Sequence, residues 1–164
     1  MYHLLKIMSE IKGLFQKMLD EYYFKEEGDF YVVDTFPAVV KSEKYFDFED
    51  NVLIPNKYNI LNKSVLALSK LYLYDENIYV LDDVESLTYS KYTKNIIEFN
   101  DDVLKFLPSR EVDKLILIFS DLRIGVLIGD GCFNYISFES KELKLVEQLC
   151  VAEGLFVFHT KDRK

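Results

Sequence analysis

The 164-residue chain has no tryptophan, two cysteines, two histidines, three prolines and six glycines. Two cysteines cannot build the disulfide framework of a small secreted domain, and Cys132 and Cys150 each lie in an apolar stretch. We therefore expect reduced, buried thiols and a cytoplasmic location. The scarcity of glycine argues against a phosphate-binding loop. Gly125, Gly129 and Gly131 have the spacing of a turn, and no Lys-Ser/Thr pair follows them.

Long apolar runs are also missing, and their absence excludes a class of protein. No run reaches the roughly 18 residues that a transmembrane helix needs, so none is expected. The apolar N-terminal stretch is interrupted by charge and lacks a small-residue cleavage site, so we do not expect a signal peptide. Hydrophobic residues make up 49% of the chain and charged residues 29%, as in a globular protein. With no repeat and no linker-like segment, residues 1–164 are predicted to form a single domain.

Helices are predicted from apolar periodicity and from capping residues. Residues 2 to 25 carry apolar side chains at steps of three and four, as in an amphipathic helix. Three shorter helices are expected from their caps: Asn62 or Ser64 to Leu71, Asp101 to Leu107 after Asn100, and Ser140 to about Glu153, ended by Gly154.

Strands are predicted where β-branched and aromatic residues cluster. The expected strands are Phe30–Phe36, Val39-Val40, Tyr45–Phe48, Val52–Ile54, Ile96–Phe99, Lys114–Phe119, Ile124–Ile128, Phe133–Phe138 and Leu155–His159. A further hairpin is expected, with arms at 71–74 and 78–81 around the polar turn at 75–77. The predicted fold class is therefore α+β: a mostly antiparallel sheet, with the N-terminal amphipathic helix and the C-terminal helix packed on it and helices covering one face.

Residues for catalysis or metal binding are few. Neither His3 nor His159 has a cysteine or a second histidine nearby in sequence, so no zinc site is expected. The adjacent carboxylates lack the ligand spacing of a calcium loop. No cofactor and no metal is predicted, and no catalytic residue is assigned. An enzyme, a small hydrolase or transferase, remains the alternative, and it would use Cys132 or His159.

The clearest functional signal is charge. The chain has 28 acidic and 20 basic side chains, a net charge of −8. Residues 20 to 102 hold 18 of the acids and only eight lysines, whereas neither end of the chain is net negative. A negative field repels phosphate backbones and anionic lipids, so direct binding to nucleic acid or membrane is not expected. A basic protein is the favoured partner.

Acidic residues in this middle region alternate with aromatic ones, as they do in interfaces that combine steering charges with aromatic anchors. The alternative is a sheet with an aromatic inner face and acidic outer edges. The candidate partner-binding residues are Asp47, Glu49, Asp50, Tyr72, Tyr74, Asp75, Glu76, Tyr79, Asp82, Asp83, Glu85, Tyr89, Asp101 and Asp102.

In these features the chain resembles bacterial immunity proteins of contact-dependent growth inhibition systems. The resemblance is of general character: small size, acidity clustered with tyrosines over residues 43–102, and no catalytic motif. It implies tight binding to a cognate toxin domain, often a basic nuclease, whose active site or substrate groove would be covered. A third possibility is a regulatory or structural subunit in which the first helix mediates self-association.

Overall fold

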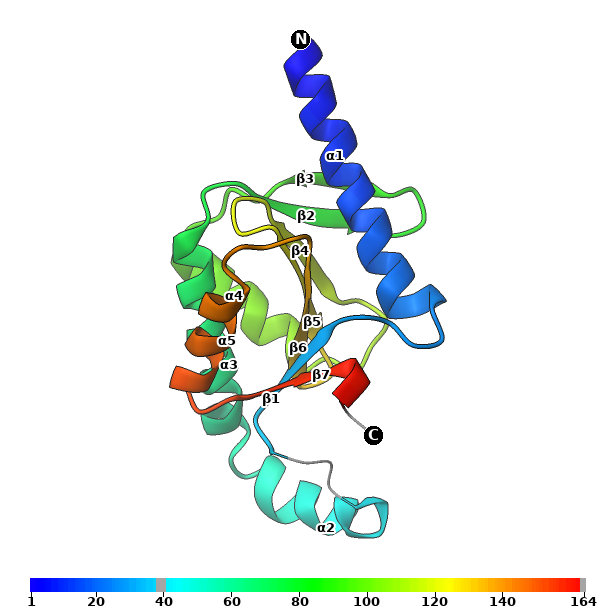
Figure 1. Cartoon of the computed structure of the whole chain (residues 1–164). Helices are drawn as coiled ribbons and strands as arrows, with labels where there is room; N and C mark the ends of the chain where they lie inside the picture. The colour runs from blue at the N-terminus through cyan, green and yellow to red at the C-terminus, as the bar shows by residue number, and fades with distance from the viewer. Residues whose placement is uncertain (38–40, 163–164) are drawn as a thin grey trace.

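The computed structural model describes residues 1–37 and 41–162, and its centre is one antiparallel sheet (Figure 1). The order of its seven strands is β3-β2-β4-β5-β6-β1-β7, and every neighbouring pair is antiparallel. The strands are β1 (Tyr31–Asp34), β2 (Ile78–Asp83), β3 (Thr88–Lys91), β4 (Leu115–Phe119), β5 (Ile124–Gly129), β6 (Cys132–Ser137) and β7 (Phe156–His159). The predicted α+β class, with a largely antiparallel sheet, is confirmed.

Five α-helices surround this sheet in the described part of the chain. They are α1 (Tyr2–Leu19), α2 (Tyr45–Phe48), α3 (Lys57–Tyr74), α4 (Ile96–Phe106) and α5 (Leu143–Ala152). A π-helical turn, η1 (Asp20–Phe24), prolongs α1, so the helix predicted over 2–25 is confirmed. A second π-helical turn, η3 (Glu49–Leu53), directly follows α2.

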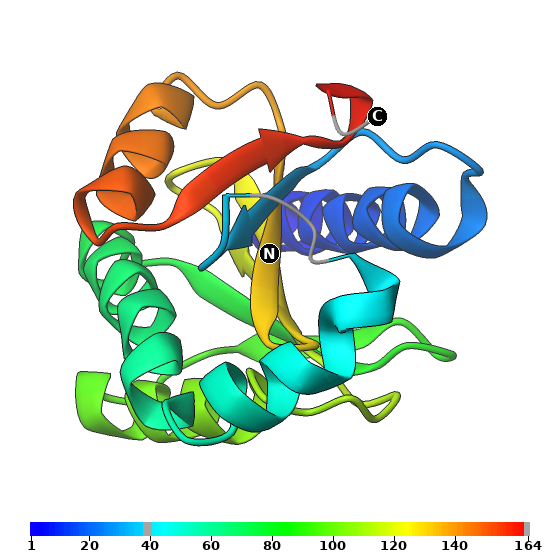
Figure 2. The same cartoon turned by 90° about the horizontal axis from the view of Figure 1, so that it is seen from below.

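Helices cover both faces of the sheet, which corrects the prediction of one covered face. All of β4 is buried, and its side chains alternate between two apolar clusters. Leu115, Leu117 and Phe119 pack with α3, α4 and α5, whereas Ile116 and Ile118 pack with α1. Figure 2 shows α1 on one side of the strands, with α3 and α5 on the other. The continuous apolar run of β4 already indicates burial on two sides.

The prediction for residues 38–62 was wrong wherever the structure describes it. The segments Tyr45–Phe48 and Val52–Ile54 are helical turns and not strands, and Val39-Val40 lies outside the described residues. The helix predicted from Asn62 or Ser64 begins earlier, at Lys57. Short apolar runs fit a helical turn as well as a strand, so periodicity cannot decide between them.

The hairpin predicted at 71–81 is also wrong, because its first arm is the end of α3. Leu68 and Leu71 continue the buried stripe of that helix, and the chain leaves it at Asp75. The second arm is a true strand, β2, but it pairs with β3 and β4.

Ile96–Phe99 opens α4 and is not a strand. The helix is capped by Asn95 and not by Asn100: the Asn95 side chain accepts from the backbone N–H groups of Ile97 and Glu98, while the Glu98 carboxylate accepts from the backbone N–H of Asn95. This reciprocal capping box is visible in the sequence as Asn-x-x-Glu.

The C-terminal third matches the prediction closely. β4, β5, β6 and β7 lie where strands were expected, and Asp130 and Gly131 both have positive φ in the turn between β5 and β6. Gly154 has φ +78° after α5, the expected helix-ending conformation. Ser140 does not cap α5, which begins at Leu143. Its hydroxyl instead accepts from the Glu142 N–H and donates to the Leu122 carbonyl.

Candidate functional site

Residues 43–58, here called the α2 arm, stand away from the sheet at one end of the molecule (Figure 1). Among the described side chains of residues 45–53, none is buried. The arm exposes Phe46 (75%), Ile54 (63%) and Tyr58 (79%). It carries four carboxylates and two lysines, a net charge of −2. Exposed apolar groups beside charge are typical of a binding surface.

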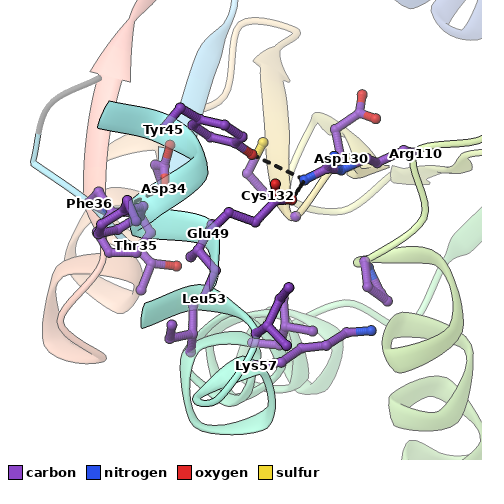
Figure 3. A pocket seen from close by; sticks show the side chains of 16 residues that line it. Asp34, Thr35, Phe36, Tyr45, Glu49, Leu53, Lys57, Arg110, Asp130 and Cys132 are labelled. Atoms are coloured by element: carbon purple, nitrogen blue, oxygen red, sulfur yellow. Dashed lines mark hydrogen bonds and ion pairs between the residues drawn. The ribbon is translucent and has the colours of Figure 1, made fainter. Parts of the chain in front are cut away.

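A cavity of about 480 Å³ lies between the α2 arm and the nearby ends of β1 and β6 (Figure 3). Its apolar lining includes Phe36, Phe48, Leu53, Ile60 and Leu61, and its charged lining is Asp34, Glu49, Lys57, Arg110 and Asp130. Cys132 also lines it, and Figure 3 shows its sulfur near the centre of the view. A mostly apolar hollow with a few convergent polar groups is the usual form of a recognition pocket.

Arg110 ties the α2 arm to the body of the protein. Its Nη2 donates to the Tyr45 hydroxyl (3.1 Å) and to the Glu49 carboxylate (2.6 Å), as drawn in Figure 3. The Phe36 and Phe48 rings meet edge to face on the opposite side of the cavity, with centroids 5.0 Å apart. The arm is thus held at two points, and neither involves a fully buried side chain of the arm. No role for Arg110 or Phe46 is apparent from the sequence alone.

Cys132 and His159 do not form a nucleophile–base pair. Tyr31 of β1 pairs with Tyr135 of β6 on one side and with His159 of β7 on the other. His159 therefore lies two strands away from β6, level with Tyr135, and Cys132 lies three residues further along β6. Three residues of strand span roughly 10 Å. His159 Nε2 instead lies 2.6 Å from Asp29 Oδ1, and its ring meets Tyr31 edge-on. Cys150 is buried on α5, and burial raises the pKa of its thiol to about 12. The burial expected of Cys150 is confirmed, whereas Cys132, also expected to be buried, is only half-buried.

The predicted partner-binding residues do not converge on one surface. The first group, Asp47, Glu49 and Asp50, lies on the α2 arm, where Asp47 and Asp50 are exposed and Glu49 pairs with Arg110. On this arm the exposed acids lie beside the exposed aromatic side chain of Phe46, as the sequence predicts.

A second group surrounds β2. From residue 75 to 90 the chain has five carboxylates, Asp75, Glu76, Asp82, Asp83 and Glu85, and no lysine or arginine. All except Asp75 are exposed. Asp75 is buried and structural, since its carboxylate accepts from the backbone N–H groups of Asn77 (2.8 Å) and Leu122 (2.9 Å). Burial raises its pKa to about 6.

Three of the four predicted tyrosine anchors are packing residues. Tyr72 stacks on Phe99 with centroids 4.3 Å apart. Tyr79 and Tyr89 pack with α1, and the Tyr89 hydroxyl donates to the Met8 carbonyl (2.6 Å). Only Tyr74 of the four is largely exposed. Around β2 the structure therefore fits the alternative, a sheet with an aromatic inner face and acidic outer edges, better than it fits a set of aromatic anchors for a partner.

The third group is on α4. Asp101 is exposed, whereas Asp102 accepts from the Tyr92 hydroxyl (2.6 Å) and pairs with Lys94 (2.7 Å). Asp102 therefore fixes the chain leading into α4 and is not free to meet a partner.

Within residues 1–37 and 41–162 no cluster of three or more histidine, cysteine or acidic side chains is placed to hold a metal ion. No helix of that part of the chain has both the length and the apolar character to span a bilayer.

Fold and site together define an α+β protein built on one seven-stranded antiparallel sheet, with a projecting arm over a mixed apolar and charged pocket. Comparison with known protein families, with characterised proteins and with solved structures finds no match in any of the three.

Proposed function

We propose that this chain is a binding protein that neutralises a basic protein partner, in the manner of bacterial immunity proteins, and that the α2 arm makes the central contact. The observation that carries the proposal is the arm itself. It is a projecting segment with exposed aromatic and aliphatic side chains beside the exposed carboxylates of Asp47 and Asp50.

In a typical interface a few residues contribute most of the binding free energy, so a small segment such as the arm can provide the central contact. Such residues are enriched in large aromatic side chains that fill pockets on the partner. Phe46 and Tyr58 are of this kind, and the cavity beneath the arm can receive a side chain in return.

Charge on the rest of the molecule supports the same partner class. The net charge of −8 includes the exposed carboxylates around β2, which lie away from the arm. Such charges accelerate encounter with a basic protein without contacting it. We therefore assign the acids around β2 to long-range steering and those on the arm to direct contact.

The enzyme alternative, which would use Cys132 or His159, cannot use the two as a nucleophile–base pair, because they lie two strands apart. The position of Cys132 in the cavity is equally suited to a packing contact with an inserted side chain.

A binding assay tests the proposal. The probe is the C-terminal domain of the protein encoded by the gene immediately upstream, with affinity measured by calorimetry at low and high salt. Asp47→Lys combined with Asp50→Lys and Phe46→Ala should weaken binding by at least about 100-fold, roughly 2.7 kcal/mol.

The matched control keeps Phe46 and reverses two exposed carboxylates on another loop, Glu26→Lys with Glu27→Lys. It makes the same change in net charge as the arm variant, so it should reduce the association rate and leave the dissociation rate nearly unchanged. If the arm variant binds as the wild type does, or if the control loses as much affinity, the arm is not the contact. If the wild type does not bind the probe at micromolar concentrations, the proposed function is wrong.

A further inference from the structure

The first half of α1 extends past the edge of the sheet. Met8 lies over β3, because its carbonyl accepts from the Tyr89 hydroxyl, and Met18 lies over β5, where its side chain contacts Gly125. Ten residues of α1 thus cross from β3 over β2 and β4 to β5. At about 1.5 Å per residue, ten helical residues span about the same distance as three strand spacings of about 4.8 Å each. The helix therefore runs roughly perpendicular to the strands. Residues 1–7 therefore reach roughly 10 Å beyond β3, the width of two further strands. Figure 1 shows this end of α1 standing clear of the sheet.

The projecting half of α1 is apolar but uncovered. Tyr2 is 87% exposed, and Leu4, Leu5 and Met8 are each about half exposed or more. In the second half of the same helix Phe15 and Met18 are fully buried against the sheet. The apolar side chains of α1 thus continue beyond the sheet that they cover.

β3 is an open edge, and α1 passes over it at Met8 before residues 1–7 project beyond it. It pairs with β2 on one side and is the last strand in the sheet order. The Tyr92 N–H donates to the Ile78 carbonyl, and by the alternation of an antiparallel ladder the backbone of Ser90 faces β2 as well. The backbone groups of Tyr89 and Lys91 therefore face outward, where another strand can pair with them.

The β2–β3 hairpin is polarised in charge. Its turn carries Asp82, Asp83 and Glu85, while its open end carries Lys91 and, further along, Lys94, which pairs with Asp102. If two such hairpins meet edge to edge and antiparallel, Lys91 of each lies beside the acidic turn of the other. Opposite charges then face each other at both ends of the contact.

We infer that a second copy of this chain docks on this edge. Two β3 strands pair antiparallel about a two-fold axis perpendicular to the sheet, so that the sheet continues from one copy into the other. Such an axis keeps both α1 helices on the same face, and their projecting halves lie side by side and antiparallel across the seam. Leu4, Leu5 and Met8 of each helix are then covered by those of the other. A two-fold contact of this kind uses one patch twice and closes on itself.

This inference goes beyond the proposed function, because β3 and the α2 arm lie at opposite ends of the molecule (Figure 1). It favours a second copy over an anionic surface, since the acidic hairpin turn repels lipid headgroups and phosphates.

Sedimentation equilibrium of the full chain between about 5 and 200 µM tests the inference, with the dimer expected at twice the 19.4 kDa of the monomer. Leu4→Glu combined with Leu5→Glu should weaken dimerisation at least about 100-fold. The matched control, Leu73→Glu with Ile97→Glu, changes two leucine-sized, strongly exposed side chains on α3 and α4 and should leave the dimer intact. Circular dichroism shows whether each variant is folded.

A charge swap tests the orientation. Lys91→Glu and Glu85→Lys should each weaken dimerisation, and the two together should restore it. Slow amide exchange at Tyr89 and Lys91 in the wild type, lost in the Leu4→Glu/Leu5→Glu variant, is the expected signature of paired β3 strands. A wild type that remains monomeric at 200 µM overturns the inference. So does a folded Leu4→Glu/Leu5→Glu variant that still dimerises, or a charge swap that fails to restore the dimer.

Discussion

Asp75 lies at the junction of α3 and β2, where its carboxylate receives the N–H groups of Asn77 and Leu122. Burial, with a contribution from the nearby Asp121 carboxylate, raises its pKa from 3.8 to about 6. Above pH 6 the carboxyl is ionised in both the folded and the unfolded chain, and the fold bears the cost of a buried charge. Below about 3.8 it is protonated in both states and the cost is absent. The contribution of Asp75 to the free energy of unfolding therefore falls as pH rises from about 4 to 6, by up to ~3 kcal/mol.

Carboxyl NMR titration checks this value directly. We expect the Asp75 resonance to titrate near pH 6, and Asp121→Asn to lower that midpoint because it removes a neighbouring negative charge. A midpoint near 3.8 in the wild type would contradict the assigned burial.

A second prediction at the scale of single residues concerns stability, and compares alanine substitutions at Gly125 and Gly13. A Cβ on Gly125 would lie 2.3 Å from the buried Met18 sulfur, because α1 crosses β5 at this point. Gly125→Ala should therefore lower the free energy of unfolding by about 1–3 kcal/mol. A Cβ on Gly13 meets nothing within 4 Å on the exposed side of α1. Gly13→Ala should raise stability by up to about 1 kcal/mol.

Urea denaturation of both variants provides the measurement. Equal effects at the two glycines would mean that α1 does not approach β5 as closely as the structure shows.

At the scale of elements, the α2 arm is only lightly anchored to the body of the protein, since none of the side chains of residues 45–53 is buried. The Arg110 contacts to Tyr45 and Glu49 hold one side of it, and both partners of the ion pair are partly exposed. Such a pair contributes about 0–1 kcal/mol, too little to affect global stability. Arg110→Ala should therefore leave the unfolding midpoint nearly unchanged, yet increase amide exchange in residues 45–53 several-fold.

Hydrogen exchange with mass spectrometry resolves this segment. Lys57→Ala, at another charged residue lining the same cavity, is the control and should leave the exchange of the arm as it is in the wild type. If Arg110→Ala does not change amide exchange in the arm, contacts other than those of Arg110 hold the arm in place.

Prediction from sequence succeeded where an element has two independent signals. β5 and β6 combine apolar runs with the Gly129–Gly131 turn, and the C-terminal end of α5 combines an apolar stripe with Gly154. It failed where a four-residue apolar run stood alone. Tyr45–Phe48 and Ile96–Phe99 became helical because their neighbours continue a helix, and local pattern alone does not carry that information. The Asn95–Glu98 capping box was the one overlooked signal that would have corrected α4.

The candidate site was only partly predictable for a similar reason. The acids at 47–50 and their aromatic neighbours can be read from the sequence. That Tyr72, Tyr79 and Tyr89 turn inward depends on α4 and α1, which reach them from distant parts of the chain. Arg110 likewise meets Glu49 only through the tertiary fold, 61 residues apart in sequence.

At the scale of the whole molecule, the two proposed surfaces divide the protein by role. Under these proposals the β3 edge and the start of α1 bind a second copy, and the α2 arm binds a basic partner. Because these surfaces lie at opposite ends, pairing through β3 leaves both arms accessible. We would then expect a complex of two copies with two partners, and each proposal can fail without the other.

The position of α1 also bears on how the chain folds as it is synthesised. The helix precedes every strand of the sheet in the chain, and β4, β5 and β6, which cover much of its buried face, begin about a hundred residues later, at Leu115. Until they emerge, Phe15 can pack only against the β2–β3 hairpin, where its ring lies near Tyr89, and Met18 lacks the strand β5 that it contacts. Contacts of such long sequence separation are slow to form. The helix that closes one face of the finished protein therefore keeps part of its apolar stripe uncovered until β5 has been made.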